Sequence, residues 1–318
     1  MKTKAGLFFM SALLLLSAAC KTTETKPVSW KERSAYFAKV RDPRIYGFSI
    51  YQTPGGVEYR GGTRVHPNQG AALLMKADKP LRPVVVMKGN LGLETLMLLD
   101  FSTSASWFDF NLAQKLGTLP VSERTAQVVN RPGEEIAGCI SMVPSIHFEQ
   151  LSIEFVPVYV RLATGFLGPL ARGIEKPEIK GVLGWDVLQK IEQIQLDYST
   201  GKILLSTAKT GYAPDPATLI AKIPLVKHAG ACAVRGMVAG KESLILIDPA
   251  GDFEFATDGA AAVSSVALAD DLLFTAPAVA DSSGGTRIGA RLLRNYRVTV
   301  CPQAGEVYFE KPDPGEGK

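Results

Sequence analysis

One pattern constrains this chain more than any other: a short apolar run that ends in a carboxylate occurs twice. Residues 96–99 (Leu-Met-Leu-Leu) precede Asp100, and residues 244–247 (Leu-Ile-Leu-Ile) precede Asp248. Apolar runs of this length, bounded by turn signals, are typical of buried β-strands. The sequence therefore predicts two buried strands that each end in an aspartate.

The two copies share further landmarks in the same order. A turn with glycine and glutamate precedes the apolar run, a hydrophobic-hydrophobic-glycine segment follows it, and a β-hairpin pattern closes the copy. This shared order predicts a duplicated unit, and chance similarity between β-hairpins is the alternative. The second copy is shorter, because its Asp and landmark glycine are 41 residues apart rather than 84. The landmarks are residues 92–94, 181–188 and 194–205 in the first copy, and residues 240–242, 286–293 and 298–309 in the second.

The length of 318 residues and the many turn residues, 30 glycines and 20 prolines, favour two β-rich domains with short connections. A hairpin that turns at residues 54–56 is expected in an N-terminal extension, which we expect to cover an exposed sheet edge of one lobe. The expected divisions are a leader (1–19), a tether (20–29), the extension (30–80), a first lobe (81–206), a linker (207–221), a second lobe (222–311) and a tail (312–318).

The N-terminus has the pattern of a secretory signal. Lys2 and Lys4 precede an apolar run at residues 7–16, and small residues lead to Cys20. The run is too short for a spanning helix. Cys20 resembles the lipidated cysteine of bacterial lipoproteins, and Lys21 after it favours the outer membrane, facing the periplasm. The alternative is an ordinary secreted protein in which Cys20 is incidental.

Charge and cysteine content exclude several classes of function. The formal charge is only +4, without the strong basic excess of a nucleic-acid binder. After Cys20, the three cysteines have no metal or redox spacing. They are expected to be buried as small apolar side chains, or Cys232 and Cys301 form a disulfide. The three histidines are isolated in sequence, so no metal site is expected.

The combination of landmarks resembles the aspartic protease fold, and within it the bacterial retropepsin-like families. Residues 98–104 read Leu-Leu-Asp-Phe-Ser-Thr-Ser, and a helix pattern ending in Leu-Gly follows at residues 111–117. Residues 182–188 and 196–202 match the later part of the family pattern. The resemblance covers residues 82 to 310 and implies an all-β, two-lobed fold made of a duplicated retropepsin-like β-barrel.

The resemblance also implies a chemistry. Two carboxylates about 3 Å apart cannot both ionise, so they share a proton and activate a water that attacks a peptide bond. Asp100 and Asp248 would be these catalytic residues, and the reaction needs no cofactor. A cleft between the lobes would hold an extended peptide, and a flap hairpin at residues 128–139 would cover it. The implied substrate-binding residues are Ser102, Ser104, Arg131, Pro132, Gly133 and Gly251.

Both motifs depart from the family pattern after the aspartate. The family has Thr or Ser next, but this chain has Phe101 and Pro249, neither of which has a side-chain donor. The family glycine is replaced by Ser102 and Ala250. Two hypotheses therefore remain: an aspartic endopeptidase that acts on peptides or proteins, or a catalytically inactive relative that binds peptide or another ligand at the cell envelope. Asp100 as a plain turn residue is a third interpretation.

Overall fold

The computed structural model describes residues 34, 36, 38–53, 56–76, 82–89, 92–131, 134–167, 178–228, 230–281 and 284–312. The described part of the chain is all-β, as predicted, with 53% strand and 11% helix. Within this part of the chain, no helix is long and apolar enough to cross a membrane. The leader, Cys20, Pro132, Gly133 and the end of the tail lie outside the described residues.

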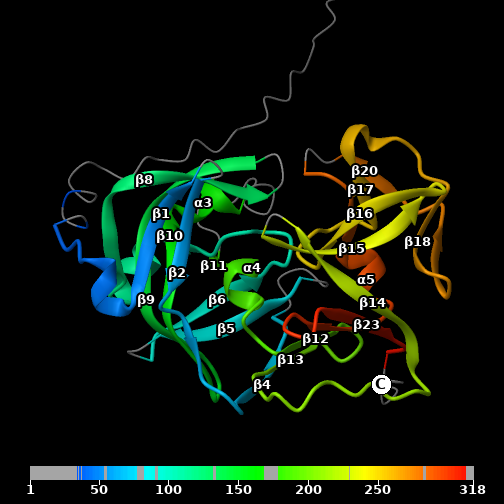
Figure 1. The fold of residues 1–318 in the computed structure, drawn as a ribbon, viewed down its shortest axis with the longest axis horizontal. Coiled ribbons are helices and arrows are strands. Elements are labelled where there is room, and N and C mark those ends of the chain that lie inside the picture. The colour runs from blue at the N-terminus through cyan, green and yellow to red at the C-terminus, as the bar shows by residue number, and fades with distance from the viewer. Residues whose placement is uncertain are drawn as a thin grey trace, which may run out of the picture.

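The first lobe is built on a closed six-stranded barrel. Its strands follow the order β10-β7-β11-β6-β5-β9, and β9 pairs back onto β10. This lobe lies on the left in Figure 1. An outer strand, β8 (Leu119–Arg131), extends β9 into a long hairpin. The barrel strands are β5 (Val84–Gly89), β6 (Glu94–Leu99), β7 (Trp107–Asp109), β9 (Glu134–Phe148), β10 (Leu151–Arg161) and β11 (Ile179–Leu183), accompanied by α2 (Phe110–Lys115), α3 (Ala163–Phe166) and α4 (Trp185–Leu188).

The second lobe repeats part of this pairing scheme. Its strands follow the order β20-β17-β21-β16-β15, which matches β10-β7-β11-β6-β5 in the first lobe. Successive pairs are parallel, antiparallel, parallel and antiparallel in both lobes. The elements are β14 (Leu219–His228), β15 (Ala231–Val238), β16 (Lys241–Asp248), β17 (Phe255–Thr257), η3 (Asp258–Ala260), β18 (Ser265–Ala269), β19 (Leu272–Thr275), β20 (Val279–Asp281), β21 (Arg287–Gly289) and α5 (Ala290–Leu293).

The two predicted closing hairpins are confirmed, and they join the lobes. One consists of β12 (Gln193–Asp197) and β13 (Lys202–Ser206), the other of β22 (Arg297–Cys301) and β23 (Glu306–Glu310). Strands β12 and β22 pair antiparallel, so the hairpins form one continuous sheet between the lobes. Ile194, Leu196, Val298 and Val300 are fully buried on it, and each contributes about 1.5–3 kcal/mol through burial.

The N-terminal extension covers sheet edges, as expected. Its elements are η1 (Pro43–Tyr46), β1 (Phe48–Thr53), β2 (Gly56–Gly61), β3 (Arg64–Val65) and β4 (Gly70–Leu74). Strands β1 and β2 form the predicted hairpin, β3 pairs with β10, and β4 pairs with β13. The Ala72 N–H, on β4, donates to the Glu149 carboxylate at 2.9 Å. This side chain occupies part of the new edge and limits further strand pairing there.

The three cysteines among the described residues are buried, and none of them forms a disulfide. The expectation of burial is confirmed, and the alternative of a Cys232–Cys301 disulfide is wrong. Cys232 lies on β15 inside the second lobe, whereas Cys301 lies at the end of β22 in the sheet between the lobes. Burial, followed by the charges of nearby glutamates, raises the pKa of Cys301 to about 11, so its thiol stays protonated.

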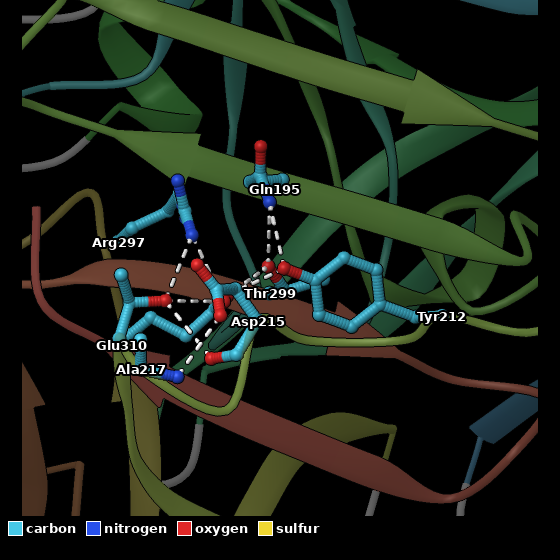
Figure 2. Close-up of polar contacts among 8 residues, drawn as sticks. Gln195, Tyr212, Asp215, Ala217, Arg297, Thr299 and Glu310 are labelled. Carbon is cyan, nitrogen blue, oxygen red and sulfur yellow. Dashed lines mark hydrogen bonds and ion pairs between the residues drawn. The ribbon is translucent and has the colours of Figure 1, made fainter. Parts of the chain in front are cut away.

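A buried polar network fixes the segment between the lobes. Glu310 is fully buried and accepts hydrogen bonds from Arg297 at 2.9 Å and from the Tyr212 hydroxyl at 2.5 Å. Gln195 donates to Thr299 at 2.9 Å and to Tyr212 at 3.2 Å (Figure 2). Burial and the hydrogen bond to Glu310 raise the pKa of Tyr212 to about 12. The predicted linker is therefore held against the sheet, and β14 begins within it.

Candidate functional site

The carboxylate of Asp100 is held by its own loop. Asp100 directly follows β6, and its backbone N–H donates to the Leu183 carbonyl on β11 at 3.0 Å. Its side chain is fully buried. Oδ1 accepts from the Ser102 N–H at 2.9 Å and the Ser102 hydroxyl at 2.7 Å, and Oδ2 accepts from the Thr103 hydroxyl at 2.8 Å. Three donors thus orient this carboxylate from within its loop.

The residue after Asp100 has a structural role. The Phe101 side chain is fully buried in the larger hydrophobic core, and its ring lies 5.9 Å from that of Trp185. Its carbonyl accepts a hydrogen bond of 2.8 Å from the Cys232 N–H on β15. Phe101 lacks a hydroxyl that could tie the two aspartate loops together, but its backbone bonds directly to the second lobe.

Ser104 also lies where the lobes meet. A Cβ placed on Gly230, just before β15, would lie only 2.8 Å from the Ser104 Cβ. Ala250, which follows Pro249 in the other loop, belongs to a buried apolar cluster whose other members, Leu98 among them, come from the first lobe. The chain segments after both aspartates therefore contact the opposite lobe.

The carboxylate of Asp248 is held by an arginine. Asp248 ends β16 and is 2% exposed. The Arg287 guanidinium donates from Nη1 to Asp248 Oδ2 at 3.0 Å, and the Arg287 side chain is only 14% exposed. The same guanidinium lies over the Phe253 ring at 5.3 Å. The second aspartate is thus one partner of a largely buried ion pair.

Arg287 breaks the correspondence between the lobes. On β21 it pairs with Leu246, two residues before Asp248, whereas on β11 Val182 pairs with Leu98, two residues before Asp100. The equivalent positions are therefore occupied by arginine in one lobe and valine in the other. Side chains two residues apart on a strand share a face, so Arg287 points to the same side as Gly289, the partner of Asp248. This spacing is the signal that could have identified Arg287 from the sequence.

The landmark glycines bring each short helix close to an aspartate loop. A Cβ on Gly184 would lie 2.5 Å from the Ala105 carbonyl oxygen, and one on Gly289 would lie 2.2 Å from the Phe253 carbonyl oxygen. Corresponding backbone hydrogen bonds follow in each lobe: Trp185 N–H to the Thr103 carbonyl at 2.7 Å, and Ala290 N–H to the Gly251 carbonyl at 2.9 Å.

Replacing Gly184 by Ala is expected to lower the free energy of unfolding by roughly 2–4 kcal/mol, because the atoms that the new methyl group meets are backbone atoms that cannot rotate away. Urea unfolding of Gly184→Ala measures the loss. Gly70→Ala is a matched control for crowding, since the nearest atom to its new methyl group would be the Leu205 carbonyl oxygen at 3.5 Å, an ordinary contact distance. Equal losses in the two variants would contradict the argument from close approach.

The second loop has its own close contacts. Gly251 has no room for a side chain, because a Cβ there would lie 2.3 Å from the Phe253 ring and 3.0 Å from Asp248 Oδ2. From the first lobe, the Tyr198 hydroxyl donates to the Pro249 carbonyl at 3.5 Å. Burial, and then the charge of Asp248, raises the pKa of Tyr198. Tyr198 therefore stays neutral beside Asp248.

The structure brings together only some of the predicted site residues. Ser102 contacts Asp100, Gly251 approaches Asp248, and Ser104 lies at the contact between the lobes. The backbone of Arg131 ends β8 and pairs with Glu134, but its side chain, Pro132 and Gly133 lie outside the described part of the chain. The sequence interpretation missed four residues around the two aspartates: Thr103, Tyr198, Phe253 and Arg287.

Asp186, at the start of α4, links this helix to the first aspartate loop. Its carboxylate accepts hydrogen bonds from the Ser106 hydroxyl at 2.8 Å and the Ser106 N–H at 3.1 Å. The Ser106 oxygen in turn accepts from the Gly184 N–H at 3.1 Å. Burial raises the pKa of Asp186 to about 6, and the hydrogen bonds from Ser106 limit the rise.

Asp186 is expected to make stability depend on pH. Its folded pKa of about 6 lies above the ordinary value of 3.8, so the folded protein binds more protons in that window and stability falls as pH rises through it. Asp186→Asn should remove about 1–2 kcal/mol of this fall. Urea unfolding at pH 4 and pH 7 measures it, with Asp270→Asn, an exposed carboxyl, as control. Parallel pH profiles for Asp186→Asn and the unmutated protein would refute the assignment.

Two further features of the molecule bear on the site. Among the described residues, no group of three His, Cys, Asp or Glu side chains could hold a metal ion. A shallow groove of about 440 Å³ lies on the second lobe near Met237, Leu268 and Leu273, and neither Asp100 nor Asp248 lines it.

Comparison of the sequence with models of known protein families, and with curated proteins, finds no match. The interpretation of the site therefore depends on the geometry around Asp100 and Asp248.

Proposed function

We propose that this chain is a catalytically inactive protein of the acid-protease fold, which binds an extended peptide or a similar ligand where its two lobes meet. The shared strand order of the lobes and their paired closing hairpins support a duplicated acid-protease architecture. A lipid on Cys20 would hold the protein at the bacterial outer membrane, facing the periplasm.

The ion pair between Asp248 and Arg287 carries the proposal. A catalytic dyad needs one proton shared between two carboxylates whose negative charges would otherwise repel. A guanidinium at 3.0 Å from Asp248 Oδ2 supplies the neutralising charge instead. Arg287 therefore favours an ionised Asp248, which has no proton of its own to donate to a substrate carbonyl.

The environment of Asp100 points the same way. Its carboxylate accepts three hydrogen bonds from its own loop and has no exposed surface. A general base must reach the proton that it abstracts, directly or through one water. Exposure of Asp100 to a substrate would require this loop to move and break bonds that now stabilise it.

A ligand remains part of this function because two lobes with a shared strand order meet at the loops after Asp100 and Asp248, while the ion pair with Arg287 changes the chemistry there. An extended peptide can add to exposed strand edges through backbone hydrogen bonds without any reaction. The contacts of Phe101 and Ser104 with the second lobe would fix the relative position of the two sides of such a site.

Incubation with a peptide library between pH 3 and pH 7 tests the proposal. The expected result is no pepstatin-sensitive cleavage by the unmutated protein, with the same background from Asp100→Asn and Asp248→Asn. Library peptides that remain bound and intact after washing would identify the ligand. Turnover that both Asn variants abolish would overturn the proposal and establish an aspartic endopeptidase.

A further inference from the structure

The N-terminal extension concentrates the positive charge of the chain on one side of the first lobe. Residues 38–53 and 56–66 contain five basic side chains against two acidic ones, a surplus of three, while the whole chain has a formal charge of +4. All five basic residues are exposed. They are Lys39, Arg41, Arg44, Arg60 and Arg64.

Exposed apolar side chains accompany this charge. Ile45 is 64% exposed and Tyr51 is 43% exposed. The Arg60 guanidinium lies 4.6 Å from the centre of the Tyr51 ring. The neighbouring residues Tyr46 and Ile50 pack against the core of the first lobe, which fixes how η1 and β1 sit on the barrel. Basic residues mixed with exposed aromatic and aliphatic ones are typical of surfaces that lie at a membrane interface.

The described part of the chain begins immediately before these residues. Tyr36 is 3% exposed, its hydroxyl shares a hydrogen bond of 2.8 Å with Ser141, and its ring lies 5.2 Å from that of Phe110, edge to face. Tyr36 therefore attaches the start of the described chain to β9 and α2. The stretch from Cys20 to Ser34 spans at most about 50 Å when fully extended. A lipid on Cys20 would keep this side of the first lobe near the bilayer.

We infer that the surface made by residues 38–47, the β1–β2 hairpin and β3, with its five basic residues, docks on the anionic phospholipid headgroups of the membrane. The opposite charges attract, and the exposed Tyr51 and Ile45 can insert among the headgroups. In Figure 1 the β1–β2 hairpin lies over the first lobe, on the left, and β18 of the second lobe lies at the right, so docking would place the hairpin rather than β18 against the bilayer. The orientation of the protein on the bilayer depends on the proposed lipid anchor, whereas the attraction of the basic surface to anionic headgroups does not.

Vesicle sedimentation tests this surface without the anchor. The probe is the mature chain from residue 20 with Cys20→Ser, mixed with vesicles of phosphatidylcholine alone or with phosphatidylglycerol added. Binding is expected only to the anionic vesicles and should weaken as salt is raised. The triple variant Lys39→Gln, Arg41→Gln, Arg60→Gln should bind on the order of 100-fold more weakly.

A second triple variant controls for net charge. Lys202→Gln, Lys209→Gln, Lys241→Gln removes the same charge from exposed positions outside the extension and should bind nearly as well as the parent. Tyr51→Ser leaves the charge unchanged and should weaken binding to the anionic vesicles several-fold. This variant still tests the surface if the first triple variant fails to fold. Equal losses in both triple variants, equal binding to neutral vesicles, or no binding at all would overturn the inference. Mass measurement of lipid on Cys20 tests the anchor separately.

Discussion

Glu310→Gln is expected to lower the free energy of unfolding by about 3 kcal/mol or more, because it removes one partner of a buried ion pair. Arg297, only 13% exposed, would keep its charge without the carboxylate at 2.9 Å. The bond from Tyr212 would weaken too, since a neutral amide replaces an ionised acceptor. The lost stability would affect the sheet that joins the lobes and the segment around Tyr212 that is held against it.

The midpoint of urea unfolding measures this loss. Glu242→Gln is the matched control, because it breaks the Arg235–Glu242 pair, whose side chains are 70% and 63% exposed. That change should cost at most about 1 kcal/mol. If Glu310→Gln and Glu242→Gln cost the same, Glu310 does not hold the lobes together as described.

Arg287→Met is expected to cost about 3 kcal/mol at neutral pH, because it leaves the Asp248 carboxylate buried without its counter-charge. Methionine keeps an apolar chain against Phe253, so the loss reports mainly on the charge. The cost should shrink as pH is lowered and Asp248 takes up a proton, since a neutral carboxyl is easier to bury than a charged one.

Arg291→Met provides the control for this effect. Arg291 lies nearby on α5 and pairs with Asp252, but the two side chains are 50% and 54% exposed. Arg291→Met should lower the free energy of unfolding by no more than about 1 kcal/mol. This cost should depend little on whether Asp248 is protonated. If Arg287→Met lowers the free energy of unfolding no more than Arg291→Met does, the buried Asp248–Arg287 pair stabilises the protein no more than an exposed pair.

Local sequence patterns predicted much of the fold. The apolar runs before Asp100 and Asp248 became central strands because buried strands need only a short apolar stretch and a turn. Gly184 and Gly289 marked the places where each short helix lies close to an aspartate loop. Glycine is needed at both positions because any side chain there would clash with the backbone of that loop. The closing hairpins were predicted from the turn residues that separate their two strands.

The remaining features depend on contacts between distant residues. Arg287 meets Asp248 from 39 positions along the chain, and Tyr212 meets Glu310 from 98 positions. Comparison of the two copies, which sets Arg287 against Val182, indicates the first pairing, whereas no local pattern indicates the second. The disulfide alternative failed for the same reason, because spacing between cysteines does not fix the direction of their strands. The pairing of the two hairpins across the lobes was likewise not predicted.

The most direct test of the central claim, that Asp248 is an ion-pair partner rather than half of a catalytic dyad, is a double-mutant cycle of Asp248→Asn and Arg287→Met. The quantity measured is the free energy of unfolding at neutral pH. The account predicts that each single variant is destabilised, and that the double variant recovers about 2 kcal/mol or more relative to the sum of the two losses. A dyad predicts the opposite, because removing one of two repelling carboxylates would stabilise the protein. Stabilisation by Asp248→Asn, with no coupling to Arg287, would contradict the account.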